Sequence, residues 1–337
     1  MPVLVAPMGG GPSTPALVAA VAEAGGSGFL PAGYLTPDAV REQVGRTRAL
    51  THRPFGVNVF VPGTARIDRG ALDRYVARLR PVAERLGVEP GEPRWDDDRY
   101  TEKIDLLVDD PVAAVSFTFG CPSAADVERL HAVGTLVIVT VTSPGQAALA
   151  EQVGADALCV QGAEAGAHQG GFDDDPDHPA GFHAQPLEPL LRAVRAASSL
   201  PLIAAGGLMT GLDIAGVLAA GADAAQLGTA FLCCPEAGTS ATHRQALLDH
   251  RYTETTFTRA FTGRTARALV NPFVREFTDD APAGYPWVHH LTRPIRVAAA
   301  RRGDADTLNL WAGQGWHLVR DLPAAELVGE LAAELAS

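Results

Sequence analysis

Residues 157–171 read Ala-Leu-Cys-Val-Gln-Gly-Ala-Glu-Ala-Gly-Ala-His-Gln-Gly-Gly, and the interpretation of the whole chain starts from them. The apolar run Ala157–Val160 predicts a buried β-strand. The small residues after it allow a backbone to approach a ligand closely. Among them stand an amide (Gln161), a carboxylate (Glu164) and an imidazole (His168). Such a set at a strand end indicates a binding site, although a glycine-rich surface loop with an incidental histidine would look the same.

An apolar run followed by a helical pattern recurs along the chain and predicts repeated βα units. Eight strands are expected, at residues 3–6, 27–30, 55–60, 113–117, 135–141, 156–160, 201–205 and 224–227. Unusual small or polar residues lie in or directly after several of them, at Pro7-Met8-Gly9, Asn58, Gln161–Gly171, Gly206-Gly207 and Gly228-Thr229. Such loops assemble the active sites of (β/α)8 barrels. We therefore predict an α/β fold, a (β/α)8 TIM barrel, with an open doubly wound sheet as the alternative because strand order cannot be read from sequence.

Two segments depart from this repeat. Residues 61–110 form an excursion that contains a helical pattern and then a stretch rich in proline, glycine and aspartate. Residues 236–305 carry mostly helical patterns, including residues 253–278, and we expect a smaller, mainly helical lid or substrate domain over the barrel mouth. Residues 1–235 are assigned to the barrel. Residues 306–337, a compact loop and an amphipathic helix, are expected to return to it.

Composition limits the partners. The chain has 337 residues, 47% hydrophobic and 20% charged, which is ample for a core. A formal net charge of -12 argues against nucleic acid and anionic membrane surfaces as partners. No segment approaches the roughly 18 uninterrupted apolar residues of a membrane span, and no signal peptide is evident. We expect a cytoplasmic protein, and its size alone suggests a homodimer.

The lysine, the cysteines, the acidic run and most of the histidines indicate no catalytic or metal-binding role. Lys103 is the only lysine, which excludes a Schiff-base or P-loop lysine almost everywhere. The four cysteines have no disulfide or metal-ligand spacing, so we expect free thiols in a reducing compartment and no metal site: Cys121, Cys159, Cys233 and Cys234. The acidic run 173–175 is predicted to be a solvated face. Histidines other than His168 are given no functional role.

Two glycine-containing loops predict a phosphate site. Gly206-Gly207 follows the seventh expected strand, and Gly228-Thr229 follows the eighth. In (β/α)8 barrels these two loops commonly bind phosphate through backbone N–H groups. Turn glycines are common, so either loop alone is a weak signal. Because no GxGxxG fingerprint or Walker lysine is present, a flavin mononucleotide or a sugar phosphate fits better than a dinucleotide.

Asn58 interrupts the buried run Phe-Gly-Val-Asn-Val-Phe at residues 55–60. A buried amide is unfavourable unless it forms hydrogen bonds. It is therefore expected to bind either its neighbours in the fold or a ligand.

Taken in register, several segments resemble the nitronate monooxygenase (2-nitropropane dioxygenase) family. They are Ala6-Pro7-Met8, the run from Ala16 to Gly28, Phe55–Asn58, Gln161–His168, Ala205–Gly207, Gln226–Thr229 and Trp311–Gly315. The resemblance covers nearly the whole chain and implies an FMN-containing barrel with a smaller helical domain. One departure is visible: the family usually has two glycines before the histidine, and here the second is Ala167.

The resemblance also implies roles for individual residues. Those expected to contact the flavin are Met8, Asn58, Gln161 and Gly166. Those expected to hold its ribityl phosphate end are Gly206, Gly207, Gln226, Leu227, Gly228 and Thr229. His168 matches the active-site histidine, and Glu164 is expected only to orient the loop.

The implied reaction is FMN-dependent oxidation of alkyl nitronates, or of neutral nitroalkanes, by O2 to carbonyl compounds and nitrite. An imidazole of ordinary pKa, about 6.5, can accept the α-proton of a nitroalkane or bind nitro oxygens once protonated. Two alternatives stay open. One is a flavin-dependent enoyl-acyl carrier protein reductase that uses NAD(P)H, for which the sequence has no nicotinamide signal. The other is a flavin- or phosphate-binding protein without turnover.

Overall fold

The structure, a computed structural model, describes residues 1–337 and contains a closed barrel of eight parallel strands. In order around the barrel they are β1 (Val3–Val5), β2 (Ser27–Pro31), β3 (Gly56–Phe60), β4 (Ala114–Thr118), β5 (Leu136–Val141), β6 (Ala157–Gln161), β8 (Leu202–Ala205) and β9 (Ala224–Leu227). The predicted (β/α)8 TIM barrel is confirmed and the open sheet is excluded. No expected strand boundary is wrong by more than one residue.

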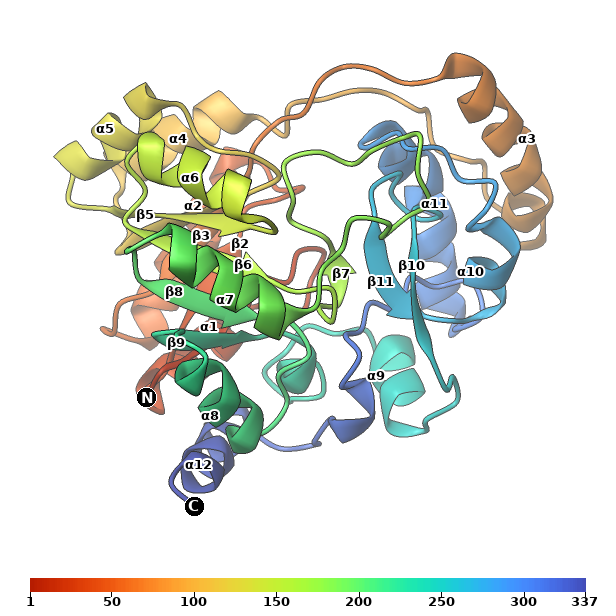
Figure 1. The fold of residues 1–337 in the computed structure, drawn as a ribbon. Coiled ribbons are helices and arrows are strands. Elements are labelled where there is room, and N and C mark those ends of the chain that lie inside the picture. Colours follow the sequence, from red (N-terminus) through yellow and green to blue (C-terminus); the bar gives the residue numbers. More distant parts are fainter.

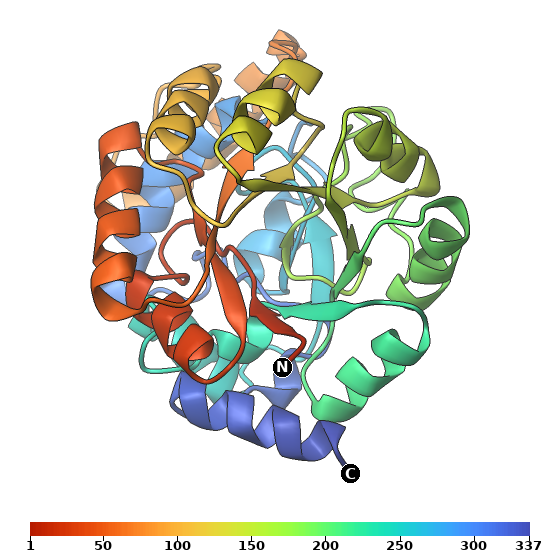
Figure 2. The same cartoon turned by 90° about the vertical axis from the view of Figure 1, so that its left-hand side faces the viewer.

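Eight helices surround the barrel (Figure 2). They are α1 (Pro15–Glu23), α2 (Pro37–Leu50), α4 (Tyr100–Asp109), α5 (Ala124–Ala132), α6 (Pro144–Gln152), α7 (Leu187–Ala197), α8 (Gly211–Ala219) and α12 (Ala324–Leu335). Several begin at a side-chain cap; for example, the Thr14 side chain accepts a hydrogen bond from the Leu17 N–H at 3.1 Å. The C-terminal helix α12 packs against α1 and α8 and thereby closes the ring.

Alternation along the strands explains the barrel interior. One set of side chains joins the apolar layer beneath the helices. The other set points into the barrel, where five of its members form a small apolar cluster: Phe29, Ile138, Cys159, Ile203 and Ala205. Gly56 is required there, because a Cβ atom at this position would lie 2.2 Å from the Phe29 ring.

Inward positions become polar toward the carboxyl ends of the strands. The Asn58 amide nitrogen donates to the Ser116 hydroxyl at 2.9 Å and to the Thr118 hydroxyl at 3.0 Å. Thr118 in turn lies 3.4 Å from the Thr140 hydroxyl. The buried amide is thus bound by the neighbouring strands, and the barrel interior changes from an apolar cluster to a polar rim at the end that carries the predicted site.

A lobe lies at this end of the barrel (Figure 1). Its antiparallel sheet has the order β10 (Thr255–Thr258), β11 (Ala266–Leu269), β7 (Ala167–His168). Its helices are α9 (Ala241–Leu248), α10 (Pro272–Phe277) and α11 (Trp287–Arg302), and two short 3-10 turns, η1 (Thr229–Phe231) and η2 (Trp316–Leu318), adjoin it. Helices predominate, but the expectation of mostly helical structure at residues 253–278 was wrong, because the first part of that segment pairs with the loop after β6.

The excursion after β3 contributes α3 (Arg69–Arg85) to this lobe. A second hydrophobic core combines residues 72–86 with residues 232–316. The Tyr75 hydroxyl, fully buried, donates to the Ala260 carbonyl at 2.6 Å and ties α3 to the lobe. None of the helices has the length and apolar character that a membrane span requires.

Candidate functional site

The Gln161 side chain closes the loop that follows β6. Its Nε2 donates to the His168 carbonyl at 3.1 Å, and its Oε1 accepts from the Gly170 N–H at 2.6 Å. The amide therefore spans the loop and sets the position of the main chain at His168. Contact between Gln161 and a flavin stays a prediction.

Glu164 orients the same loop from the other side, as its sequence context suggested. Its carboxylate accepts from the Leu187 N–H at 3.0 Å, at the first residue of α7. The favourable position of a carboxylate at a helix N-terminus explains this contact. Gly166 has a packing reason of its own, because a Cβ atom there would lie 2.6 Å from the Gly313 nitrogen.

His168 lies where the barrel loop meets the lobe. Residues 167–168 form β7, whose Ala167 and His168 pair with Arg267 and Ala266 of β11. The imidazole Nε2 is 2.8 Å from the Thr262 hydroxyl. Rings of Phe119, Tyr285 and Trp311 lie around it, with centroid distances of 5.5, 5.8 and 5.9 Å. The histidine is thus held in a mainly aromatic enclosure by a single side-chain hydrogen bond.

The expectation of an ordinary pKa for His168 was wrong. Burial, together with the positive charges of Arg264 and Arg296, lowers the pKa of His168 to about 3. The imidazole is therefore neutral at neutral pH. It has a lone pair available, but in the free protein its protonated form is strongly disfavoured.

Ala167 adopts a left-handed backbone conformation, with φ of 59°. This conformation is unfavourable by about 1–2 kcal/mol for an L-residue with a side chain. It explains physically why glycine suits this position in the family pattern.

Replacing Ala167 by glycine is expected to raise the free energy of unfolding by up to about 1 kcal/mol, because relief of the strain exceeds the added entropy of the unfolded chain. Urea denaturation would measure it. The control is Gly216→Ala, at a helical position with open space for a Cβ atom. This variant is expected to be more stable than the wild type, because alanine favours the helix more than glycine does. A lower stability of Ala167→Gly would contradict the claim that the backbone at Ala167 is strained.

The two predicted phosphate loops present backbone donors without acceptors. The N–H groups of Gly206, Gly207, Leu208 and Gly228 form no hydrogen bond within the chain. Gly206 and Gly207 have φ of 124° and 73°, and a Cβ atom at Gly207 would lie 2.8 Å from that of Glu164. Several free N–H groups at a glycine-rich turn make an anion-binding concavity. These residues therefore fit the phosphate of a mononucleotide.

The remaining predicted cofactor residues surround these loops in different ways. The Thr229 hydroxyl accepts from the Gly313 N–H at 2.9 Å, and the Gln226 amide lies 3.5 Å from the Cys159 sulfur inside the barrel. The Leu227 side chain is buried in the apolar layer beneath the helices, which leaves only its main chain for a ligand. Met8 packs beside Gly228, its sulfur 3.7 Å from where a Cβ atom would stand.

Sequence reasoning missed most of the lobe's contribution to the site. The lobe residues are Thr262, Arg264, Tyr285, His289 and Arg296, and beside them lie two aromatic residues from barrel loops, Tyr34 and Phe119. Tyr34 stacks on His289 with ring centroids 4.1 Å apart. His289 was expected to have no functional role, but it lies among the residues around the candidate site. Polar residues at alternate positions, such as Ser116 and Thr118, were a readable signal for the barrel rim. No comparable pattern marks the lobe residues.

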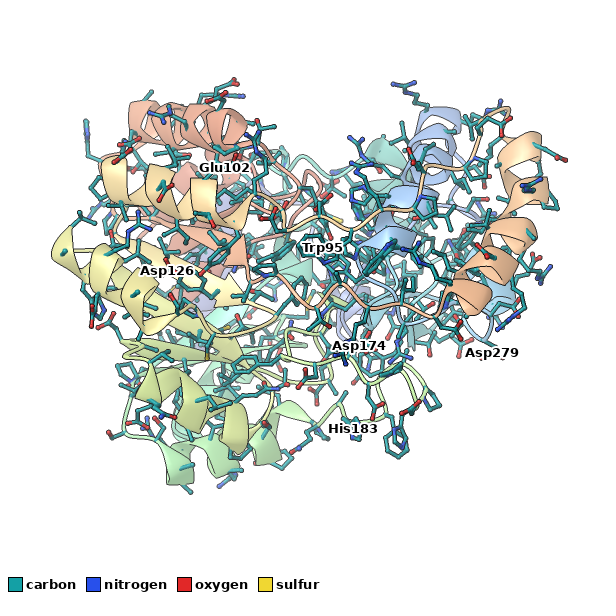
Figure 3. All side chains as sticks on the ribbon, turned by 90° about the horizontal axis from the view of Figure 1, so that it is seen from above. Trp95, Glu102, Asp126, Asp174, His183 and Asp279 are labelled. Atoms are coloured by element: carbon teal, nitrogen blue, oxygen red, sulfur yellow. The ribbon has the colours of Figure 1, made fainter.

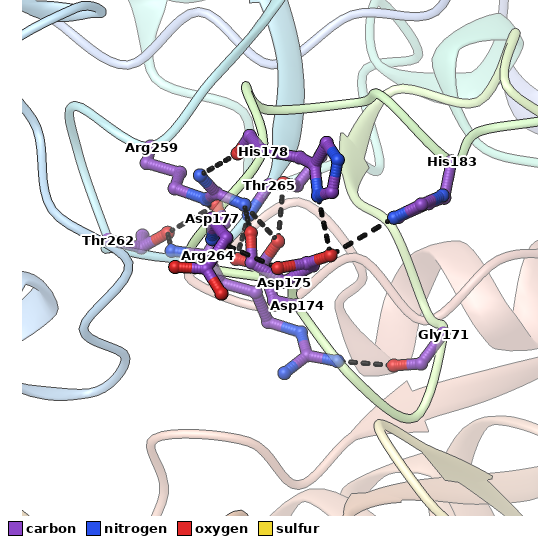
Figure 4. Close-up of polar contacts among 10 residues, drawn as sticks. All are labelled: Gly171, Asp174, Asp175, Asp177, His178, His183, Arg259, Thr262, Arg264 and Thr265. Atoms are coloured by element: carbon purple, nitrogen blue, oxygen red, sulfur yellow. Dashed lines mark hydrogen bonds and ion pairs between the residues drawn. The ribbon is translucent and has the colours of Figure 1, made fainter. Parts of the chain in front are cut away.

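The acidic run was predicted to be a solvated face, and for Asp174 this was wrong. Asp174 lies between the barrel and the lobe (Figure 3) and accepts from Arg259 at 2.8 Å and from the Thr265 hydroxyl at 2.7 Å. The side chains of Arg259 and Asp174 are 8% and 15% exposed. Figure 4 shows how this pair attaches residues 174–178 to the lobe.

Asp175 of the same loop binds two histidines. Its carboxylate is 2.7 Å from His178 Nδ1 and 3.2 Å from His183 Nε2 (Figure 4). Together with the Asp177 N–H these contacts lower the pKa of Asp175. One ligand atom from each of the three lies within 4.8 Å of the others, a grouping that could hold a metal ion, whereas no metal site was expected from the sequence. All four cysteines are free, as predicted.

The fold and site define a class: a (β/α)8 barrel with a histidine and a group of free backbone N–H donors at the carboxyl ends of its strands. The family model for nitronate monooxygenase matches residues 1–334. A nitronate monooxygenase of Paraburkholderia phytofirmans is 40% identical over 344 residues, covering 99% of this chain and 92% of the relative. The chain belongs to the nitronate monooxygenase family, a family of oxidoreductases, which confirms the resemblance.

Solved structures agree with this assignment. A nitroalkane oxidase from Streptomyces ansochromogenes is 51% identical, with a TM-score of 0.96, over 100% of this chain and 96% of the other. FabK from Thermotoga maritima is 25% identical, with a TM-score of 0.74, over 99% and 92% of the two chains. The likeness is thus greater to the protein described as a nitroalkane oxidase.

Proposed function

We propose that this protein is an FMN-dependent nitronate monooxygenase that oxidises alkyl nitronates with O2 to carbonyl compounds and nitrite. The observation that carries the proposal is the neutral His168 on one barrel loop, with four unpaired backbone N–H groups on the loops after β8 and β9. Membership of the nitronate monooxygenase family supports the proposed oxidation of nitronates. Residues 61–110 and 236–305, with α3 in the second core, would form the substrate side of the pocket.

Each part of the site has a role in this proposal. The N–H groups of Gly206, Gly207, Leu208 and Gly228 would hold the FMN phosphate. When bound, the flavin supplies the electron acceptor that passes substrate electrons to O2. The hydrogen bond between His168 Nε2 and the Thr262 hydroxyl would fix the orientation of the imidazole ring. The aromatic rings around His168 would contact the alkyl group of the substrate and limit access of water.

The visible spectrum of the purified protein tests the cofactor directly, and flavin absorption bands are expected. Oxygen uptake should then follow addition of an alkyl nitronate, with nitrite formed, and should not depend on NADH. Absence of a flavin would reject every flavoenzyme interpretation. Reduction of the flavin by NADH without activity on nitronates would instead favour a reductase.

A further inference from the structure

Two arginines near His168, the buried Arg264 and the half-buried Arg296, form no salt bridge with a carboxylate. Arg264 is 8% exposed, its Nε is buried without a hydrogen-bond partner, and another of its nitrogens donates to the Gly171 carbonyl. Arg296 donates only to Thr292 and His289. Neither forms an ion pair with a carboxylate within 4.0 Å. Burial lowers the pKa of Arg296 to about 10, which still leaves it charged at neutral pH.

Two of the other buried cations, Lys103 and Arg259, are paired with carboxylates, and the third, Arg267, donates to the Ala163 carbonyl and the Thr255 hydroxyl. Lys103, fully buried, pairs with Asp98 at 2.7 Å, and Arg259 pairs with Asp174 at 2.8 Å. A buried charge is unfavourable unless an opposite charge or a ligand compensates it. Arg264 is therefore distinguished by a buried guanidinium nitrogen that has no hydrogen-bond partner, and its guanidinium lies over Phe119, which borders the candidate catalytic histidine.

Contacts connect both arginines to one enclosure. The Arg264 guanidinium lies 4.0 Å from the Phe119 ring centroid, and Phe119 borders His168 and Tyr285 at 5.5 Å each. On the other side the Arg296 guanidinium lies 3.3 Å from His289 Nδ1, and the His289 ring faces Tyr285 at 6.4 Å. The cationic groups thus border the aromatic enclosure around His168.

We propose that Arg264 and Arg296 form a binding site for a small planar oxyanion next to His168, and that this site makes the anionic nitronate the preferred substrate over the neutral nitroalkane. The inference rests on the proposed function. A nitronate carries its negative charge on two oxygens of a planar NO2 group, which matches the planar donor fork of a guanidinium. Its alkyl group would contact Phe119, Tyr285 and Trp311.

The location of the two arginines separates this site from the phosphate donors. Both come from the lobe: Arg264 precedes β11, and Arg296 lies on α11. The four free N–H groups come from the barrel loops after β8 and β9. The barrel would therefore hold the anionic end of the cofactor, and the lobe would hold the anionic end of the substrate.

Nitrate is a suitable probe because it is a planar oxyanion that cannot be oxidised. Isothermal titration of the purified protein with its cofactor is expected to show nitrate binding, with nitrate competing against nitronate in oxygen uptake. Arg264→Met should weaken nitrate binding by about 10- to 100-fold, the range for a charge-assisted hydrogen bond, and should raise KM for nitronate more than for nitroalkane. Arg264→Lys should be intermediate.

Arg275→Met is the matched control, because Arg275 lies on the same lobe in an exposed pair with Glu254. It should bind nitrate like the wild type. Flavin content and circular dichroism check folding, and Arg296→Met provides a second variant if Arg264→Met does not fold.

Equal nitrate affinity in the wild type and in both arginine variants would overturn the proposal. Nitrate binding only to flavin-free protein would also overturn the proposal, because the arginines would then bind the cofactor and not the substrate. Nitrate binding lost in the variants, without nitronate turnover by the wild type, would support the oxyanion site and reject the proposed function. Nitronate turnover by a wild-type protein that does not bind nitrate would support the proposed function and reject the oxyanion site.

Discussion

Replacing His168 by asparagine is expected to lower turnover of a neutral nitroalkane by about 100-fold or more, while flavin content is unchanged, because the variant has no group that can accept the α-proton. Turnover of a preformed nitronate should fall less, since that proton is already absent. Oxygen uptake with both substrates measures the difference. The exposed His52→Asn is the control and should behave like the wild type.

The pH dependence gives a second measurement on the same residue. With a pKa of about 3, His168 is neutral at all pH values above that range. We therefore expect kcat/KM for nitronate to show no histidine titration near pH 6.5. Unchanged nitroalkane kinetics in His168→Asn would reject the base assignment, and a wild-type titration near pH 6.5 would contradict the lowered pKa.

Removing Asp174 is expected to lower the free energy of unfolding by about 3–5 kcal/mol. The Asp174→Ala variant leaves Arg259 buried without its counter-charge, near the unpaired Arg264. Guanidinium chloride denaturation at pH 7 measures the loss. The control is Glu254→Ala, which breaks an exposed pair with Arg275 and should change stability by less than about 1 kcal/mol. A similarly small effect in Asp174→Ala would show that the buried pair contributes little.

Lowering the pH should reduce the difference in the free energy of unfolding between Asp174→Ala and the wild type. Burial alone would raise the pKa of Asp174, but hydrogen bonds from Arg259 and Thr265 hold it below its ordinary value. A carboxyl with a lowered folded pKa stabilises the protein above its unfolded pKa, about 3.9, and this stabilisation disappears as the pH falls through the folded value. The stability difference should therefore be full at pH 6 and decrease below about pH 4.

The barrel and its binding loops could be predicted from the sequence because their signals are local. Apolar runs such as Ala157–Val160 bury both faces of a strand, and the turn residues after them mark the carboxyl ends. In a parallel barrel all these ends lie on one side. The loops Gly206-Gly207 and Gly228-Thr229 could thus be placed at the same end of the barrel as His168 without knowledge of the tertiary structure, and their binding of phosphate stays a prediction.

The lobe side of the site was decided only by the tertiary structure. Thr262 and Arg264 are about a hundred residues away from His168 in the chain, and they meet it because β11 pairs with β7. Asp174 in an acidic run and Arg259 in a mixed segment each look like surface residues until folding buries them together. Charge, burial and pKa depend on what surrounds a side chain. The sequence therefore determined the barrel and the positions of its binding loops, whereas the electrostatic character of the pocket depends on long-range contacts that no local pattern contains.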